Sequence, residues 1–269
     1  MLPMDLVLVR HGQSEGNAAK RLAEKGDESA YTPEFLNRHT ASFRLTKTGR
    51  SQAKRAGKWL RDEFFEDSFG FDRFLMSEYT RAEETAALLN LPDASWLPEF
   101  NLTERDWGDL DNCTQSEREN RFKEALKMRE IEPFFSRPPN GESMAQACLR
   151  IWRILHMLHE ECSDKRVIIV CHGEIMWAFR MMLERTPKDR FKRLYLSKRP
   201  ENKIHNCQII HYTRRNPKTG ELAKHANWVR MVRPTQRPVW VGNWKKIVRP
   251  RYSNEQLLKR VSKIPSFVK

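Results

Sequence analysis

The sequence predicts an α/β fold, a three-layer sandwich with a mostly parallel central sheet and helices on both faces. Two observations lead to this prediction. Short apolar runs over residues 5–10 and 166–171 are typical of buried strands, and helical apolar spacing appears between and after them. An apolar content of 39% over 269 residues is enough to enclose a sizeable core, and no internal repeat of fixed period points to a solenoid.

The first predicted strand ends in a loop at His11 and Gly12. Residues 18–45 are polar and show no clear period, so we expect an inserted loop or cap segment there. A helix is expected to follow, with Thr46 or Thr48 as its N-cap. Its apolar side chains recur at helical spacing, at Ala53, Ala56, Leu60 and Phe64.

A second strand is expected over residues 71–76, and the helix over residues 81–90 ends before Pro92 because proline disfavours helix at the preceding residue. Another helix is expected to begin near Ser143. Its apolar stripe comprises Met144, Cys148, Ile151, Leu155 and Leu158.

The strand at residues 166–171 leads into a helix over residues 174–183. Segments 206–213 and 228–232 follow, with a Pro- and Gly-containing turn between them. These two segments predict an antiparallel hairpin at one edge of the sheet.

Charge is distributed unevenly along the chain. Residues 183–269 hold 23 of the 49 Lys and Arg but only 5 of the 35 Asp and Glu, a net charge of +18, whereas residues 1–182 sum to −4. Aromatic side chains lie among these cations, at Trp228, Trp240, Trp244 and Tyr252. The composition of residues 183–269 is therefore typical of a surface that binds nucleic acid or another polyanion.

The basic region is also compatible with roles that involve no polyanion. It could be a solvated tail, or it could pair with an acidic face of the same protein or of a second subunit in a homo-oligomer. Among polyanionic partners, composition does not choose between nucleic acid, a membrane surface and an acidic protein.

Five cysteines without CxxC spacing argue against a disulfide framework and against a tetrahedral zinc site, which favours a reducing, cytoplasmic setting. The first ten residues contain no basic leader, and no apolar run approaches the roughly 20 residues of a membrane span. There is no HExxH motif, P-loop or GxGxxG fingerprint, so we expect neither a metal nor a cofactor.

Two of the eight histidines, His11 and His172, are followed by glycine, and both come directly after the two most strand-like runs. Parallel strands would bring both imidazoles to one edge of the sheet, where glycine lets backbone approach a ligand. Arg10 precedes His11, and Arg81 follows the second predicted strand. Because guanidinium groups suit bidentate recognition of phosphate, this set of side chains predicts a phosphoryl site.

Six stretches occur in a fixed order along the chain, namely LVRHGQSEGN (8–17), LTKTGRSQA (45–53), SEYTRAEETA (77–86), LTERDWG (102–108), GES (141–143) and VCHG (170–173). In this form and order they resemble the motifs of the histidine phosphatase superfamily, the phosphoglycerate mutase-like proteins of the RHG branch. The resemblance covers residues 5 to about 180. It implies a catalytic domain over residues 1–234, followed by a basic C-terminal extension over residues 235–269.

The resemblance implies that His11 is the nucleophile and forms a phosphohistidine. It assigns the phosphoryl oxygens to Arg10, Arg81 and His172, and further substrate-binding groups to Ser14, Asn17 and Gly173. A neutral imidazole is a competent nucleophile near pH 7, and cations fixed around the phosphoryl group stabilise its charge without a metal.

The same resemblance points to an acid within residues 102–108, and we choose Glu104 as the general acid and base. One carboxyl group can protonate the leaving alcohol and later accept a proton from water. Its rivals, Glu78, Glu83 and Glu84, lie beside or within the first turns of the Arg81 helix, where the helix dipole explains acidic residues. The alternative role for Glu104 is a surface salt bridge to Arg105.

Hydrolysis of a phosphorylated small molecule is the leading hypothesis. A phosphoglycerate mutase-type phosphotransferase is the alternative, because it uses the same histidine. The mutases' proline-rich run beside paired arginines is not found between Glu104 and Gly141, which favours hydrolysis. A third hypothesis is a phosphate- or polyanion-binding protein that uses its basic C-terminal region.

Overall fold

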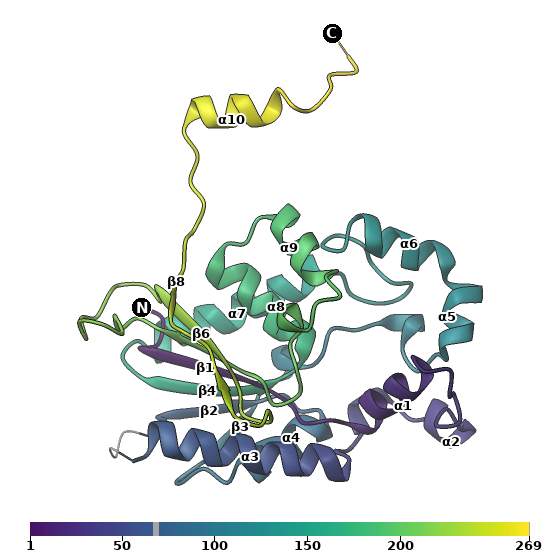
Figure 1. Ribbon diagram of the computed structural model, residues 1–269, viewed down its shortest axis with the longest axis horizontal. Helices are drawn as coiled ribbons and strands as arrows, with labels where there is room; N and C mark the ends of the chain where they lie inside the picture. The colour runs from purple at the N-terminus through teal and green to yellow at the C-terminus, as the bar shows by residue number, and fades with distance from the viewer. Residues whose placement is uncertain (67–69, 269) are drawn as a thin grey trace.

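The structure is a computed structural model and describes residues 1–66 and 70–268. Its strands are β1 (Asp5–Arg10), β2 (Arg73–Met76), β3 (Trp96–Pro98), β4 (Arg166–Cys171), β5 (Ile209–Thr213), β6 (Trp228–Arg233), β7 (Trp240–Val241) and β8 (Lys245–Lys246). They form one eight-stranded sheet in the order β3-β2-β4-β1-β5-β6-β7, with β8 also paired to β6 (Figure 1). The sheet confirms the predicted α/β class.

Four long helices cover the sheet, and each corresponds to a predicted one. They are α3 (Lys47–Phe64), α4 (Thr80–Leu89), α7 (Met144–Glu161) and α8 (Gly173–Glu184). Thr46 is the N-cap of α3, since its hydroxyl accepts a hydrogen bond from the Gly49 amide at 3.0 Å. Ser143 caps α7 in the same way, within a capping box completed by Gln146.

The core has two halves, one on each face of the sheet. Along β1, Val7 and Val9 pack with α3 and α4, whereas Leu6 and Leu8 pack with α7 and α8. All four side chains are buried, because successive strand residues point to opposite faces and both faces are covered. This arrangement is the predicted three-layer sandwich.

The expectation of a mostly parallel sheet is only partly right. The β1–β4, β2–β4 and β2–β3 pairs are parallel, but β1–β5 and every pairing of β6 found in the described residues are antiparallel. The physical reason lies in the connections. After α8 the chain returns to β1 from the opposite direction, and the predicted hairpin of β5 and β6 then extends the sheet antiparallel.

Smaller elements surround the carboxyl ends of β1 and β4. The expected cap segment, residues 18–45, contains α2 (Pro33–Leu36), the 3₁₀ turn η1 (Thr40–Ser42) and most of α1 (Glu15–Ala23), which begins three residues earlier. Helices α5 (Gln115–Arg121) and α6 (Lys123–Ile131) lie at the same end of the molecule (Figure 1), and α9 (Lys188–Tyr195) follows α8. The remaining 3₁₀ turns are η2 (Phe100–Leu102), η3 (Gly108–Leu110) and η4 (Pro200–Asn202).

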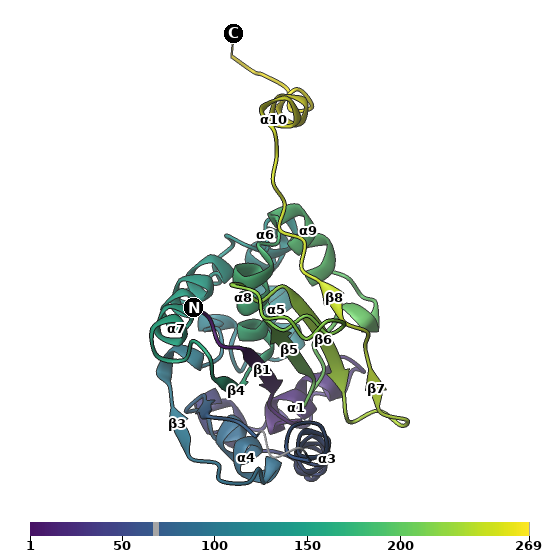
Figure 2. The ribbon, with the colours of Figure 1, turned by 90° about the vertical axis from the view of Figure 1, so that its left-hand side faces the viewer.

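The first part of the predicted C-terminal extension, residues 235–269, belongs to the sheet. Strands β7 and β8 pair with β6, and Ile247 is buried in the core. Arg249 then donates hydrogen bonds to the carbonyl groups of Leu183 and Ala226 and to the Asn227 side chain, at 2.7–3.1 Å. Beyond this contact the chain leaves the domain and carries α10 (Asn254–Val261) away from it (Figure 2).

Candidate active site

A cleft of about 1010 Å³ opens at the carboxyl ends of β1 and β4. Its lining includes most of the expected site residues, namely Arg10, His11, Ser14, Asn17, Arg81, Glu104 and Gly173. His172 is fully buried beside them, with its ring centroid 5.0 Å from that of His11. The structure therefore brings together residues that the sequence separates by more than 160 positions.

His11 has a defined tautomer. Its Nδ1 lies 2.7 Å from the Gly12 carbonyl oxygen, which can only accept, so Nδ1 carries the proton. Its Nε2 accepts a hydrogen bond from Nε of Arg81 at 3.3 Å. Burial, together with the charges of Arg81 and Arg10, holds the pKa of His11 well below the ordinary value. The imidazole is therefore neutral, and its lone pair is on Nε2.

His172 is the N-cap residue of α8 and directly precedes Gly173, which lines the cleft. Its Nε2 is 2.7 Å from the Ser77 hydroxyl, and its buried Nδ1 has no hydrogen-bond partner among the described residues. Burial and the nearby Arg81 charge lower the pKa of His172 well below its usual value. A buried imidazole with one unused nitrogen is suited to meeting a bound polar group.

The two predicted arginines are held by backbone carbonyl groups. Arg10 donates to the Ile204 carbonyl at 2.5 Å, and its buried Nε has no partner among the described residues. Arg81 is only 7% exposed and donates to the Thr40 carbonyl at 2.6 Å, so the cap segment helps to position it. Both guanidinium groups are thus held at the cleft by backbone carbonyl oxygens, and cations positioned in this way can stabilise the charge of a phosphoryl group.

Ser14 and Asn17 shape the loop after β1. The Ser14 hydroxyl accepts from the Asn17 amide at 3.2 Å and so caps α1. The Asn17 side chain accepts a 2.9 Å bond from Asn206, which also donates to the His11 carbonyl at 3.2 Å. Sequence reasoning missed Asn206, because no motif surrounds it and it lies 195 residues from His11.

Gly12 lets this loop approach helix α3 closely. A Cβ added at Gly12 would lie 2.5 Å from the Gly49 carbonyl oxygen, a distance that real Cβ atoms do not reach. The Gly12 amide also donates to Thr85 of α4 at 3.0 Å. These contacts fix the backbone next to His11 against both helices.

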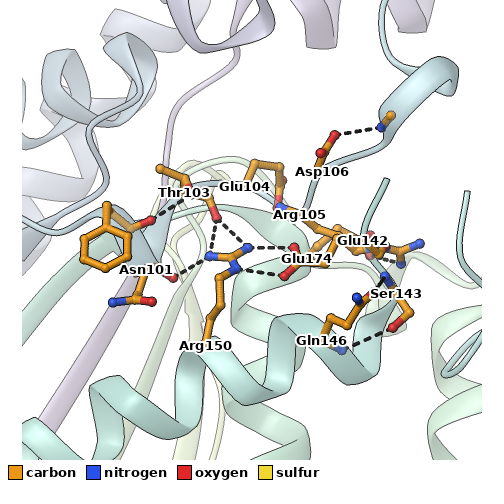
Figure 3. Close-up of polar contacts among 12 residues, drawn as sticks. Asn101, Thr103, Glu104, Arg105, Asp106, Glu142, Ser143, Gln146, Arg150 and Glu174 are labelled. Atoms are coloured by element: carbon orange, nitrogen blue, oxygen red, sulfur yellow. Dashed lines mark hydrogen bonds and ion pairs between the residues drawn. The ribbon is translucent and has the colours of Figure 1, made fainter. Parts of the chain in front are cut away.

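Arg150 organises the segment that carries Glu104, as Figure 3 shows. Its guanidinium forms two 2.8 Å bonds with the Glu142 carboxylate. It also donates to the carbonyl groups of Asn101 at 2.6 Å and Thr103 at 3.2 Å. The residues immediately before Glu104 are therefore tied to α7 by charge-assisted hydrogen bonds.

Glu104 faces the cleft, and burial is the main cause that raises its pKa to about 7. The Glu174 carboxylate raises it further, while Arg81 and Arg10 oppose the shift. Glu174 itself accepts from Arg105 at 3.1 Å and from the Tyr195 hydroxyl at 2.7 Å. The ion pair of Arg105 is thus with Glu174, whereas Glu104 accepts a hydrogen bond from the Arg105 backbone amide at 3.0 Å.

A second group of cations lines the cleft away from His11. It comprises Lys20 of α1, Arg118 of α5 and Arg129 of α6. Arg129 lies over the Trp107 ring at 4.6 Å and donates to the Tyr195 hydroxyl at 3.2 Å. Sequence reasoning missed these residues and Glu174, although the position of Glu174 next to Gly173, in the second-histidine motif, was an available signal.

In residues 1–66 and 70–268 no group of three or more His, Cys, Asp and Glu side chains is placed to hold a metal ion. The five cysteines are buried and free. Cys171 precedes His172, and burial raises the pKa of its thiol far above the usual value. The cleft is therefore lined by imidazole and guanidinium groups and by carboxyl groups, and burial raises the pKa of two of these carboxyl groups, Glu104 and Asp111.

Comparison with known families gives a match over most of the chain. The profile of the histidine phosphatase superfamily (branch 1) matches residues 6–219. A 2,3-bisphosphoglycerate-dependent phosphoglycerate mutase of Methylobacterium radiotolerans is 31% identical over 185 residues, covering 66% of this chain and 78% of the mutase. A mutase of the same description from Afipia carboxidovorans is 31% identical over 198 residues, covering 70% and 85%.

Solved structures with this fold include phosphatases. A mycobacterial glucosyl-3-phosphoglycerate phosphatase in complex with VO3 has a TM-score of 0.61 at 20% identity, covering 78% of this chain and 92% of that one. An alpha-ribazole phosphatase from Shigella flexneri has a TM-score of 0.59 at 21% identity, covering 83% and 96%. At these identities the likeness supports the fold alone.

Proposed function

The chain belongs to the histidine phosphatase superfamily (branch 1), and from this premise we propose that it hydrolyses phosphomonoesters through a phosphohistidine on His11. One observation carries the proposal most directly. The Gly12 carbonyl holds the proton of His11 on Nδ1, and the lone pair on Nε2 therefore faces the arginine-lined cleft. A neutral, oriented imidazole among fixed cations is suited to attack phosphorus.

In the first step, Nε2 of His11 bonds to phosphorus and the bond from phosphorus to the alcohol oxygen breaks. Protonated Glu104 gives its proton to the departing oxygen, which leaves as an alcohol. Arg81 releases Nε2 and binds the phosphoryl oxygens, together with Arg10 and His172. A pKa near 7 lets Glu104 hold this proton at neutral pH.

In the second step, water attacks phosphorus and the bond from phosphorus to Nε2 breaks. The Glu104 carboxylate, left ionised by the first step, accepts a proton from the water. Inorganic phosphate leaves, and His11 recovers its lone pair. Glu104 alternates between acid and base, and its raised pKa places both forms within reach at neutral pH.

Phosphotransfer of the phosphoglycerate mutase type is the second candidate, and the 31% identity to two phosphoglycerate mutases favours it. Such an enzyme uses the same phosphohistidine but returns the phosphoryl group to a second substrate hydroxyl. Lys20, Arg118 and Arg129 add positive charge to the cleft, which suits an anionic substrate under either reaction.

Phosphate release from sugar phosphates, nucleotides, phosphoglycerates and 5'-phosphorylated RNA tests the proposal. Hydrolysis of at least one class is expected, and it should survive excess EDTA because arginine and histidine meet the phosphate. Conversion of 3-phosphoglycerate to 2-phosphoglycerate without phosphate release would establish the mutase instead. Loss of turnover on chelation, with recovery on adding Mg²⁺, would contradict the mechanism.

The basic region over residues 183–269 is further proposed to bind a polyanion, alongside catalysis in the preceding residues. A cytoplasmic setting is proposed as well, supported by the five free, buried cysteines. The alternative is that the basic region pairs with a second subunit of a homo-oligomer, and light scattering on the full chain tests whether such an oligomer forms.

A further inference from the structure

Helix α10 and the residues around it form a segment that stands apart from the domain (Figures 1 and 2). Every side chain over residues 251–268 is exposed. The hydrogen bonds of this segment are local, such as the cap of α10 in which the Ser253 hydroxyl accepts from the Gln256 amide at 3.2 Å. The segment is thus a structured helix without a partner in the described part of its own domain.

Helix α10 is amphipathic. Leu257, Leu258 and Val261 lie on one side of it, because residues three and four positions apart are neighbours on a helix surface. The polar side carries Lys259 and Arg260, and Lys263 follows the helix. Exposed apolar side chains continue past its end at Ile264, Phe267 and Val268, with exposed fractions of 68%, 91% and 85%.

We propose that residues 251–268 attach the protein to the surface of an anionic lipid bilayer, with α10 lying in the interface. An interfacial helix combines an apolar side, which enters the boundary of the acyl chains, with cations that remain among the anionic headgroups. Residues 251–268 contain both features and little negative charge, since Glu255 is their one carboxylate side chain. In the described part of the chain no helix is long and apolar enough to cross a membrane.

The packing of the aromatic residues favours lipid over nucleic acid. Trp244 packs against the His211 ring at 4.8 Å and beneath the Arg230 guanidinium at 4.5 Å. Trp240 has Arg233 over its ring at 4.8 Å. Trp244 is therefore engaged within the domain, and Trp240 is 41% exposed but has a guanidinium over its ring. These two rings do not form a row of free stacking surfaces of the kind that single-stranded nucleic acid uses.

The cations and apolar groups support the same choice. Arg249 donates to two carbonyl groups and the Asn227 side chain, which removes its guanidinium from the set available to phosphates. Contact with a nucleic-acid backbone would leave Leu257, Leu258 and Val261 in water. At a bilayer interface the apolar side of α10 can contact acyl chains while its charged side contacts the headgroups.

Co-sedimentation of the full chain with lipid vesicles tests the proposal. We expect binding to vesicles of phosphatidylcholine with about one third phosphatidylglycerol, and much weaker binding to pure phosphatidylcholine. The double variant Leu258→Glu and Val261→Glu should reduce the affinity for anionic vesicles at least about tenfold. Raising the salt concentration should weaken binding by the wild type, because salt screens the headgroup charge.

Leu149→Glu on α7 is the matched control, because Leu149 is 67% exposed and lies outside α10. It should bind anionic vesicles like the wild type. Hydrolysis of a small phosphomonoester by all three proteins reports whether each is folded, and this readout is independent of lipid binding. Equal loss of vesicle binding in the control and in the α10 variant would overturn the proposal.

Two further measurements separate other partners. If the wild type does not bind anionic vesicles but binds single-stranded RNA, the lipid proposal is wrong and the nucleic-acid hypothesis is supported instead. If light scattering shows a dimer that Leu258→Glu and Val261→Glu convert to a monomer, and vesicles do not compete with dimerisation, a second copy covers the apolar side of α10 and the lipid proposal fails. Vesicle binding by a monomeric wild type, with loss in the double variant, supports the proposal.

Discussion

The cleft and the C-terminal segment both rely on arginine, but in opposite surroundings. In the cleft, Arg81 is 7% exposed and is fixed by the Thr40 carbonyl. In the segment after Arg249, Arg260 is exposed and lies only over the Tyr252 ring, at 4.5 Å, among the described residues. Buried, preorganised cations can stabilise one developing charge in one place, whereas exposed cations attract any anionic surface. The same residue type therefore supports chemistry in one region and attachment in the other.

His11→Ala should have the largest effect, a loss of turnover of at least about 10⁴-fold, because it removes the attacking nitrogen. Acid-labile phosphate labelling should disappear in parallel. His156→Ala on the exposed side of α7 is the matched control and should keep both. Labelling that persists in His11→Ala would show that the nucleophile is another residue. The assignment of catalysis to the cleft and of attachment to the C-terminal segment would then fail.

Glu104→Gln should slow turnover of alkyl phosphates by about 10²–10⁴-fold, because glutamine can neither give nor accept the proton. An activated ester such as p-nitrophenyl phosphate needs little protonation of its leaving group. Its burst of phosphoenzyme formation should therefore be nearly normal, followed by slow hydrolysis. Equal slowing of the burst for both classes of ester would show that Glu104 is not the acid.

Glu174→Gln should shift the pH dependence while changing turnover at neutral pH by less than about tenfold. Wild-type kcat/KM should fall as pH rises through about 7, where Glu104 loses its proton. Removing the Glu174 charge lowers the pKa of Glu104, so this fall should begin at a lower pH. The other groups around Glu104 are unchanged in the variant, namely Arg10, Arg81, Tyr79, Arg150 and Cys171.

Tyr195→Phe is the control for this shift. It removes the 2.7 Å hydrogen bond to Glu174 but keeps the carboxylate charge. Its pH profile should stay close to that of the wild type. A similar shift in both variants would mean that local packing, rather than the Glu174 charge, sets the pKa of Glu104.

Removing residues 251–269 should have the smallest effect on hydrolysis, less than about twofold, because the described residues of this segment make no hydrogen bond to the domain. Removing residues 235–269 should be far more harmful. That deletion exposes the edge of β6 and removes the buried Ile247. Thermal unfolding of the two truncated proteins checks this difference, and equal melting temperatures would contradict it.

Much of the fold was predictable from local sequence. The strands at 5–10 and 166–171 and the helix that starts after Thr46 follow from apolar spacing and capping, which are short-range properties. The antiparallel hairpin of β5 and β6 was predicted, but the antiparallel pairing of β5 with β1 was harder to foresee, because the direction of a strand depends on how the chain returns. The short β7 and β8 carried no signal, since two residues do not establish a period.

The candidate site also has residues that the sequence predicted and residues that it did not. His11, Arg81 and His172 stand in motifs whose spacing in sequence is recognisable, and the structure brings their side chains together. Asn206 and Arg150 act through contacts with distant parts of the chain, at Asn17 and Thr103 among others. Such partners become visible only when the chain is folded, because any asparagine or arginine can make these hydrogen bonds and no local pattern marks them.

Because Arg249 is hydrogen-bonded to the domain, it determines the length of the linker between the domain and α10, which acts as a tether. Between this residue and α10 only residues 250–253 are free of the domain, and four extended residues span at most about 14 Å. A domain attached to a bilayer through α10 would stay within a few Debye lengths of the surface. Its cleft would then meet phosphorylated molecules held at that surface at a high effective concentration, set by the reach of the tether rather than by affinity at the cleft.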